Sequence, residues 1–515
     1  MAELVQSASN VSSDEQKALA LKEEGNALIS ACKYGLAAEK YTQAIALCPS
    51  ATLYSNRAQA YIKMESYGLA IVDADEAIRL DPAFIKGYYR RGSANYALGI
   101  GNVEKLKAAR KDFKTVLSIH PKDADALKKY QECDSKIKLA AFSAAIENDE
   151  DNVASKLANL DLESIAVASD YTGPRMITNA DGKMTREACM TVAFVHELIA
   201  TFRDQKLLHR KYMMQMLLWA IEMFRETPTL VDIPLPVVDG VKGHFTVCGD
   251  THGQYYDLLN IFEIGGFPSP TNPYLFNGDF VDRGSFSLEV VSTLLAIKLA
   301  MPTAMYMSRG NHETKNMNKI YGFEGEVKHK YDDKVMNLFN EVFQWLPLAS
   351  VIEKSVFVVH GGLSTSMGGS GNGDGPDGKG MTLDAVRSIS RGREPPESGL
   401  MSDLLWSDPQ PFNGRAASKR GVGYSFGPDY TRNFLALNNL KLVVRSHEVK
   451  EEGYVVEHDG KCITVFSAPN YCDSQGNKGA YIRFTEDMIP RFTTFTCVPH
   501  PNVPPMRYAG NMFGL

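Results

Sequence analysis

The stretch HFTVCGDTHGQ, residues 244–254, places an apolar run directly before an aspartate and a histidine that one residue separates. Short apolar runs are typical of buried strands, and the glycines that follow allow a tight turn and a close approach of the backbone. Asp250 and His252 are therefore predicted to lie side by side at the end of a strand. A single turn of this kind is common, so its meaning depends on the rest of the chain.

Five further apolar runs repeat the pattern. YLF is followed by NGDFVDRG, AMYM by SRGNHE, VFVV by HGG, KLVV by RSHE and ITVF by SAPNY. From residue 244 onward these runs alternate with helical stretches, which predicts an α/β body. Ligands in α/β folds bind at the carboxyl ends of strands. We expect the six strand ends to form one site.

Most of these ends carry a side chain that binds metal ions: Asp250, His252, Asp279, Asn311, His360 and His447. Three oxygen donors and three imidazoles without a thiolate favour Mn, Fe or Zn over Ca or copper(I). Six donors are too many for one catalytic ion with an open position. They suit two ions that share a carboxylate and polarise a water for attack on phosphorus.

Other residues in the same motifs fit phosphate chemistry. The guanidinium groups of Arg283 and Arg420 can each contact two phosphate oxygens. His312 follows Asn311 directly and can protonate a leaving alkoxide, with Asp282 fixing its orientation. This chemistry requires no nucleophilic side chain.

Residues 17–137 are helical in composition and repeat. Gly25, Ala58 and Gly92 align as small residues of successive first helices, and Ala37, Ala70 and Ala109 align in the second helices. Prolines at 49, 82 and 121 follow at intervals of 33 and 39 residues. A period near 34 predicts three tetratricopeptide repeats. The longer interval predicts about five extra residues in the turn of the third repeat, around GIGNV.

The predicted organisation is multidomain, with an all-α helical array before the α/β body. A glycine-rich tract at 367–380 is predicted to be a surface loop. The predicted segments are a disordered tail, the repeats, a helical extension with a linker, the catalytic domain and a C-terminal tail, at 1–14, 15–137, 138–185, 186–496 and 497–515.

Composition excludes several classes of protein. The net charge of −6 and the pI near 6.0 give no general attraction to nucleic acid. Eight cysteines without a CxxC pair argue against a disulfide framework or a structural zinc. No apolar run is long enough to span a membrane, and no basic, apolar leader opens the chain. We expect a monomer in the cytoplasm and nucleus.

The six motifs in order, GDTHGQ, GDFVDRG, RGNHE, HGGL, RSHE and SAPNYCD, resemble those of the metal-dependent serine/threonine phosphoprotein phosphatases. With the repeats in front, the chain resembles the repeat-bearing branch of that family. The resemblance implies a central β-sandwich flanked by helices and two divalent ions, with Mn serving in vitro and Fe or Zn natively. It implies that Asp250, His252 and Asp279 hold one ion, and that the other is held by Asp279, Asn311, His360 and His447.

The same resemblance implies phosphate contacts from Arg283, Asn311, Arg420 and Tyr471. It implies that His312 is the general acid, paired with Asp282. Arg309 and Arg445, although inside the motifs, are interpreted as supporting residues.

The helical array offers cations and amides at helical spacing. Lys22 and Asn26 lie four residues apart, as do Lys86 and Arg90, so each pair shares a helix face. Such groups bind a carboxylate, although a solvated helix face is the alternative. The resemblance implies a clamp for the C-terminal acid of the ninety-kilodalton heat-shock chaperone, formed by Lys22, Asn26, Asn56, Lys86 and Arg90.

The resemblance also implies regulation. In similar phosphatases the array blocks the catalytic groove until a chaperone tail or a fatty acid displaces it. Glu65 matches a carboxylate that meets the phosphate-binding arginines, here Arg283 or Arg420. The C-terminal tail at 497–515 is expected to help this autoinhibition.

The predicted function is hydrolysis of phosphoserine and phosphothreonine in proteins. One alternative is a metallophosphoesterase that acts on nucleotides or other small phosphates. A second is a chaperone adaptor whose phosphatase body is inactive.

Overall fold

The computed structural model describes residues 13–99, 102–146, 162, 164–178, 183–364 and 380–503. Residues 1–12 of the predicted tail, 367–379 of the glycine-rich tract and 504–515 at the C-terminus lie outside the described residues. The chain divides into a helical unit, residues 1–153 with 417–421, and a second unit, residues 154–416 with 422–515. The domain boundaries drawn from the sequence stay predictions.

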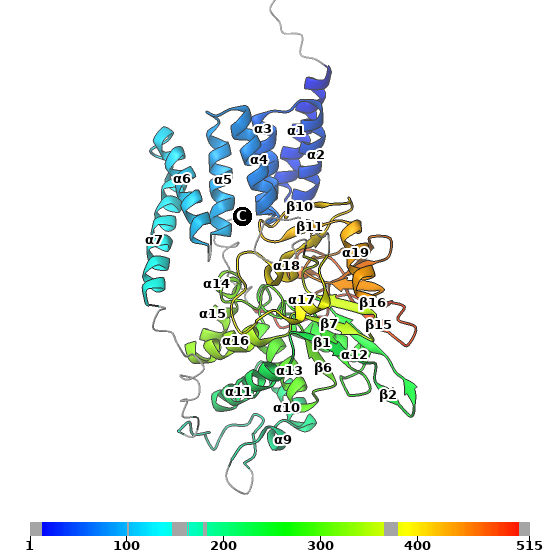
Figure 1. Cartoon of the computed structure of the whole chain (residues 1–515). Coiled ribbons are helices and arrows are strands. Elements are labelled where there is room, and N and C mark those ends of the chain that lie inside the picture. Colours follow the sequence, from blue (N-terminus) through cyan, green and yellow to red (C-terminus); the bar gives the residue numbers. More distant parts are fainter. Residues whose placement is uncertain are drawn as a thin grey trace, which may run out of the picture. The chain divides into compact units, whose positions relative to one another are not determined.

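The helical unit contains seven described helices, drawn in blue to cyan in Figure 1. They are α1 (Ser13–Ser30), α2 (Tyr34–Leu47), α3 (Ala51–Lys63), α4 (Tyr67–Leu80), α5 (Ile85–Leu98), α6 (Val103–Ile119) and α7 (Ala124–Ile146). Consecutive helices pack against each other as antiparallel neighbours, which confirms three repeats followed by an additional helix.

Small residues lie where the helices of each repeat cross. Ala58, Ala70 and Ala109 are completely buried. A Cβ on Gly25 would lie 2.6 Å from the ring of Tyr41, so this crossing has no room for a larger residue. The small-residue pattern in the sequence therefore reports close helix packing.

Two equivalent ion pairs locate the extra residues of the third repeat. Arg57 binds both carboxylate oxygens of Asp73 at 2.8 and 2.7 Å, and Arg91 binds those of Asp112 at 2.9 and 2.8 Å. Arg57 and Asp73 are 16 residues apart in sequence, whereas Arg91 and Asp112 are 21 apart. The insertion therefore lies between Arg91 and Asp112. We predicted it in the turn, but α6 has 17 residues where α4 has 14, so most of it lengthens a helix. Added helical turns satisfy their own backbone hydrogen bonds, which an added loop does not.

The second unit is built on two main sheets. A six-stranded sheet has the order β1-β7-β8-β12-β14-β13, and a five-stranded sheet has the order β16-β15-β4-β5-β6. The strands of the first are β1 (Leu230–Ile233), β7 (Ala349–Ile352), β8 (Val356–Val359), β12 (Leu442–Arg445), β13 (Tyr454–Glu457) and β14 (Cys462–Val465). Those of the second are β4 (Phe245–Cys248), β5 (Tyr274–Phe276), β6 (Met305–Met307), β15 (Gly479–Phe484) and β16 (Arg491–Phe495). All six apolar runs singled out in the sequence are strands.

The two sheets pack face to face. Along β8, Val356 and Val358 enter a core shared with Phe245 and Val247 of the other sheet, whereas Phe357 turns outward. This alternation follows from the two-residue period of a strand. Because both faces of each sheet are covered, the central strands are apolar throughout. The structure is the β-sandwich flanked by helices that the resemblance implied.

Helices cover both outer faces of the sandwich (Figure 1). One cluster joins the outer face of the five-stranded sheet to α10 (Val192–Arg203), α11 (Arg210–Glu226), α12 (Tyr255–Gly265), α13 (Ser287–Ala300), α15 (Phe323–Lys330) and α16 (Asp333–Trp345). The other joins the six-stranded sheet to α17 (Leu383–Arg387), α18 (Leu400–Trp406) and α19 (Pro428–Asn438). Short elements complete the unit: α9 (Arg186–Cys189), α14 (Lys315–Tyr321), β2 (Val237–Val238), β3 (Val241–Lys242), β9 (Asp408–Pro409), β10 (Arg415–Ala417), β11 (Tyr424–Phe426) and the 3₁₀ helix Tyr471–Asp473.

None of the helices described combines the length and apolar character that a membrane crossing requires. All eight cysteines fall within the described residues, and none of them forms a disulfide.

Candidate dinuclear metal site

The six polar strand ends belong to two groups of parallel neighbours. In the five-stranded sheet, β5 pairs in parallel with both β4 and β6. In the six-stranded sheet, β12 pairs in parallel with both β8 and β14. Parallel neighbours end at the same edge of a sheet, so each sheet contributes three loops to the site.

Glycines allow these loops to touch. A Cβ on Gly249, directly after β4, would lie 2.1 Å from the carbonyl oxygen of Val465 in the opposite sheet. A Cβ on Gly310 would lie 2.2 Å from Oδ1 of Asp279. Both distances are far below any real contact of a Cβ, so the glycines of GDTHG and RGNHE are required by the crossing of loops.

The six predicted donors come together. Nε2 of His360 lies 3.2 Å from Oδ2 of Asp279, 2.9 Å from Oδ1 of Asn311 and 3.3 Å from Nδ1 of His447. Nε2 of His252 lies 3.6 Å from Oδ2 of Asp279 and 3.7 Å from Oδ2 of Asp250. All six side chains are buried.

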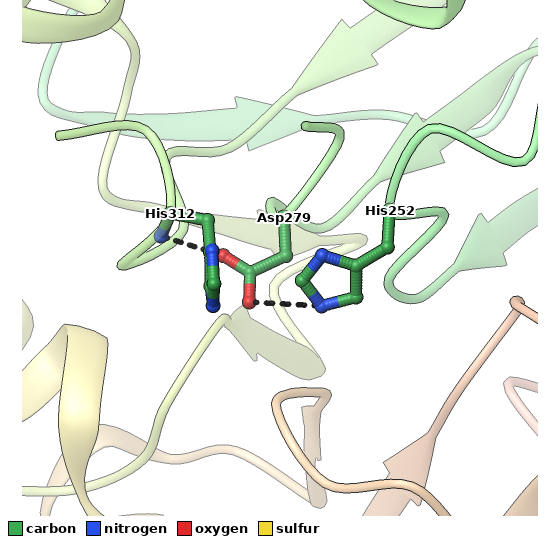
Figure 2. Close-up of side chains that lie close together, drawn as sticks. All are labelled: His252, Asp279 and His312. Atoms are coloured by element: carbon green, nitrogen blue, oxygen red, sulfur yellow. Dashed lines mark hydrogen bonds and ion pairs between the residues drawn. The ribbon is translucent and has the colours of Figure 1, made fainter. Parts of the chain in front are cut away.

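Asp279 is shared by two groups of metal-competent side chains. Its carboxylate forms one group with His252 and His312, and a second group with His360 and His447. Within each group the ligand atoms lie within 4.8 Å of one another. Figure 2 shows the first group, with Oδ1 of Asp279 accepting the backbone N–H of His312 at 2.9 Å. A shared carboxylate between two sets of imidazoles is the arrangement that two adjacent ions need.

Backbone carbonyls fix which nitrogen each histidine presents. Nδ1 of His252 lies 2.9 Å from the carbonyl oxygen of Val281, and Nδ1 of His360 lies 2.8 Å from that of Asn277. A carbonyl only accepts a hydrogen bond, so Nδ1 carries the proton in both rings and Nε2 offers its lone pair to the cluster.

The backbone is strained at the same place. His252, Asp279, Asp282, Arg283 and His447 have φ values of 39°, 52°, 70°, 71° and 69°. Residues other than glycine seldom adopt positive φ, and such conformations gather at functional sites. These backbone conformations cost free energy, and they occur here because the side chains of these residues must point at one another.

Burial governs the ionisation of the cluster. It raises the pKa of Asp250 to about 7, and the nearby carboxylate of Asp279 raises this pKa further. Burial also holds the pKa of His252 well below its usual value, and the nearby His312 lowers this pKa further. Neutral imidazoles are the form that binds metal. Crowded carboxylates with neutral imidazoles fit two divalent ions, which would supply the missing positive charge.

His312 forms the predicted pair with Asp282. Its Nδ1 lies 2.8 Å from Oδ2 of Asp282, which is completely buried. Burial raises the pKa of Asp282 to about 7, whereas the backbone N–H of Phe323 and the side chain of Asn318 lower it. The ring of His312 packs edge-on against that of His252, with 4.8 Å between centroids.

Two of the predicted phosphate ligands lie close to this cluster. The guanidinium of Arg283 lies over the ring of Tyr321 at 3.9 Å, and that ring is 5.1 Å from the ring of His312. The ring of Tyr471 is 5.1 Å from that of His252. Arg420 lies between β10 and β11 in the segment grouped with the helical unit, so its predicted phosphate contact stays a prediction.

Two residues that support the site were not singled out in the sequence. The carboxylate of Glu313 accepts the backbone N–H groups of Asp279, Phe280 and Gly310, each at 2.8 Å. Asn277 donates to the carbonyl oxygen of Val359 and to Ser446. Both residues stand inside the motifs NGD and NHE, so their position in those motifs was the available signal.

Two arginines that were predicted to be supporting residues are completely buried. Arg445 donates to the carbonyl oxygen of Gly361 at 2.6 Å and binds Asp408 at 2.8 Å. Arg309 donates to the carbonyl oxygens of Glu313 and Arg393. They connect neighbouring loops.

In the helical unit, the residues predicted to bind a carboxylate lie on α1, α3 and α5. Nδ2 of Asn56 donates to Oδ1 of Asn26 at 3.2 Å, which joins the first and second repeats. Arg90 donates to Gln59 at 2.7 Å. Nζ of Lys22 lies 3.2 Å from Oε1 of Glu23, and Lys86 is exposed. Glu65, the predicted autoinhibitory residue, lies in the turn between α3 and α4.

Comparison with known proteins agrees with both units. The family model described as calcineurin-like phosphoesterase matches residues 243–451, and that of the PPP5 TPR repeat region matches residues 130–232. The chain is 51% identical to serine/threonine-protein phosphatase 5 of Homo sapiens, over 97% of this chain and 94% of the relative. It is 48% identical to serine/threonine-protein phosphatase T of Trypanosoma brucei brucei, over 96% and 98%.

A solved structure of a protein serine/threonine phosphatase from Saccharomyces cerevisiae, described as similar to human phosphatase PP5, is also similar. It covers 61% of this chain and 99% of its own, with 41% identity and a TM-score of 0.56. One assignment follows from three findings: the tetratricopeptide unit, the sandwich with metal donors at its strand ends, and the relatives matched over nearly their full length. The chain belongs to the serine/threonine-protein phosphatase 5 family and is a metal-dependent phosphoprotein phosphatase.

Proposed function

We propose that this phosphatase hydrolyses phosphoserine and phosphothreonine with a water at a dinuclear site, under the control of its own repeats. The observation that carries the proposal is the shared Asp279 between two sets of imidazoles, with the His312–Asp282 pair beside it. When bound, the two ions would activate the attacking water and neutralise charge on the phosphate. Mn is proposed to serve in vitro, and Fe or Zn natively.

The chain's own residues perform the remaining tasks. Arg283, whose guanidinium lies over the ring of Tyr321, binds phosphate oxygens together with Arg420, Asn311 and Tyr471. As the water oxygen bonds to phosphorus and the water gives up a proton to solvent, the bond from phosphorus to the seryl oxygen breaks. His312 gives the Nε2 proton to that oxygen, and Asp282 stabilises the imidazolium through Nδ1. The products are the free hydroxyl and inorganic phosphate.

The proposed ligands follow the assignment drawn from the motifs. Asp250, His252 and Asp279 hold one ion, while Asp279, Asn311, His360 and His447 hold the other. His312 also lies near enough to the first group to be a ligand. We assign it to proton transfer, the role that the resemblance of its motif implies.

The helical unit is proposed to bind the C-terminal tail of the ninety-kilodalton heat-shock chaperone. Burial lowers the pKa of Lys63, and the neighbouring charges of Arg90 and Lys129 lower it further. The positive charges of these side chains on α3, α5 and α7 therefore repel one another. An anion bound between them would reduce this repulsion. A peptide that ends in acidic residues and a free carboxylate has the required charge.

A peptide-binding measurement tests the clamp. Lys86→Ala and Arg90→Ala are expected to weaken binding of an acidic peptide at least about tenfold, because each removes a charge-assisted hydrogen bond. Lys107→Ala, at an exposed position of α6, is the matched control. Equal affinity of the free and the amidated peptide would contradict a carboxylate clamp.

Self-inhibition is the second regulatory part of the proposal. The repeats are proposed to restrain the catalytic unit until a chaperone tail or a fatty acid releases them, with Glu65 paired to Arg283 or Arg420 and the tail at 497–515 assisting. Glu65→Ala is expected to raise basal activity, whereas Glu104→Ala, a similarly charged but exposed control, leaves it unchanged. The enzyme is further proposed to act as a monomer in the cytoplasm and nucleus.

The central experiment compares rates of p-nitrophenyl phosphate hydrolysis with added Mn. It uses the full chain, a chain starting at residue 186, and the full-chain variants Asp279→Asn and Asp384→Asn. Asp384 is an exposed aspartate and serves as the control. We expect the shortened chain to be faster and Asp279→Asn to be inactive. An active Asp279→Asn would refute the site, and equal rates of full and shortened chains would refute self-inhibition.

A further inference from the structure

We propose that Asn318 is a positioning residue that holds the His312–Asp282 pair in the orientation needed to protonate the leaving group. The inference rests on the proposed function, because it assumes that His312 is the general acid. Asn318 contacts neither the cluster of metal donors nor the predicted phosphate ligands by any hydrogen bond among the described residues.

One nitrogen atom connects the two members of the pair. Nδ2 of Asn318 donates to Oδ2 of Asp282 at 3.1 Å and to the backbone carbonyl oxygen of His312 at 2.7 Å. The same Oδ2 accepts the hydrogen bond of the His312 ring at 2.8 Å. The amide, the carboxylate and the histidine therefore form a closed ring, which restricts rotation of both side chains.

The chain turns sharply next to Asn318, and this turn completes the support. Gly322 ends α14 with a φ of 116°, and α15 begins immediately after it. The turn directs the backbone N–H of Phe323 to Oδ1 of Asp282 at 2.9 Å. It also lets the carbonyl oxygen of Tyr321 accept the N–H of Arg283 at 3.0 Å. The corner between α14 and α15 thus holds both oxygens of Asp282 and the residue after it.

Only the donor half of the Asn318 amide is used. Its Oδ1 is buried and has no hydrogen-bond partner among the residues that the structure describes. A buried acceptor without a partner costs about 1–3 kcal/mol of stability. The nitrogen, which donates to both members of the pair, is the part of the side chain that supports them.

The test compares a poor and a good leaving group. A seryl alkoxide must be protonated as it leaves, whereas p-nitrophenolate leaves readily without a proton. Loss of general acid catalysis costs about 10²–10⁴-fold in rate when the proton is needed. Misorientation of His312 should therefore slow a phosphoserine peptide far more than p-nitrophenyl phosphate. A purely structural defect would slow both equally.

The variants are Asn318→Ala, which removes the donor, and Asn318→Asp, which places a carboxylate against Asp282. Asn316 lies on the same helix and is exposed, so Asn316→Ala and Asn316→Asp are matched controls. With Mn and the full chain, we expect kcat on the phosphopeptide to fall at least about tenfold in both Asn318 variants. On p-nitrophenyl phosphate we expect a fall of no more than about threefold, and metal content should stay the same.

His312→Asn in the same assay separates this inference from the proposed function. If His312→Asn selectively slows the phosphopeptide and Asn318→Ala does not, only the positioning role of Asn318 is refuted. If His312→Asn slows both substrates equally, the acid role and the positioning role are refuted together. If Asn318→Asp fails to fold, Asn318→Ala decides, and an equal loss on both substrates refutes the inference.

Discussion

Replacing Gly310 by alanine should damage catalysis through one methyl group. The new Cβ would lie 2.2 Å from Oδ1 of Asp279 and 2.4 Å from its backbone nitrogen, whereas ordinary contacts of a Cβ begin near 3.4 Å. Asp279 or the RGNHE loop must therefore move by roughly 1 Å, and a displacement of that size costs on the order of 10²-fold in rate. Overpacking of a rigid core also costs about 1–3 kcal/mol of stability.

The assay is hydrolysis of a phosphopeptide with Mn, together with metal content by mass spectrometry and thermal unfolding. We expect kcat to fall on the order of 10²-fold and bound metal to decrease, because Asp279 is shared by both ligand groups. Gly325→Ala is the matched control. A Cβ at Gly325 meets nothing within 4 Å, and the residue lies inside α15, where alanine is favoured over glycine.

Full activity and full metal content in Gly310→Ala would contradict this prediction. That result would mean that the loops around Gly310 and Asp279 move by about an ångström without loss of activity. Their close approach would then not explain why glycine is present. Equal damage from Gly310→Ala and Gly325→Ala would refute it in another way, since only one of the two methyl groups meets a neighbour.

Three other perturbations have defined outcomes. Removing metal with a chelator is expected to abolish hydrolysis and lower the unfolding temperature of the second unit, because buried Asp250 and Asp279 lose their counter-charge; added Mn should restore both. Asp73→Ala leaves the guanidinium of Arg57 largely buried without its carboxylate and should destabilise the helical unit by about 3 kcal/mol, seen as faster hydrogen exchange in α3 and α4; unchanged exchange would contradict this. Burial lowers the pKa of Lys298 from 10.5 to about 8, so the unfolded chain holds the proton more tightly. Lys298→Met should therefore stabilise the chain at pH 7 by about 2 kcal/mol, and denaturant titrations should show this gain shrinking as pH rises from 8 to 10.5.

Sequence reasoning succeeded where a local pattern has a local cause. The run before Asp250 is a strand because it is apolar, and the repeat helices are helices because small residues recur at their crossings. It was wrong about where the third repeat takes up its extra residues. A count of residues between prolines does not distinguish a longer turn from a longer helix, and the choice depends on where backbone groups find partners.

By itself, the sequence determined the six strands, the donor types at their ends and the three helix pairs, because each is set by residues near one another in the chain. Tertiary structure alone decided which donors share a place. The backbone N–H of His447 reaches Oδ1 of Asp250 across 197 residues of sequence, at 3.1 Å. The supporting contacts of Glu313 and Asn318 were decided in the same way, since they depend on loops that only the order of strands in two sheets brings together. Side-chain identity sets what a residue can bind, and sheet order sets which residues it meets.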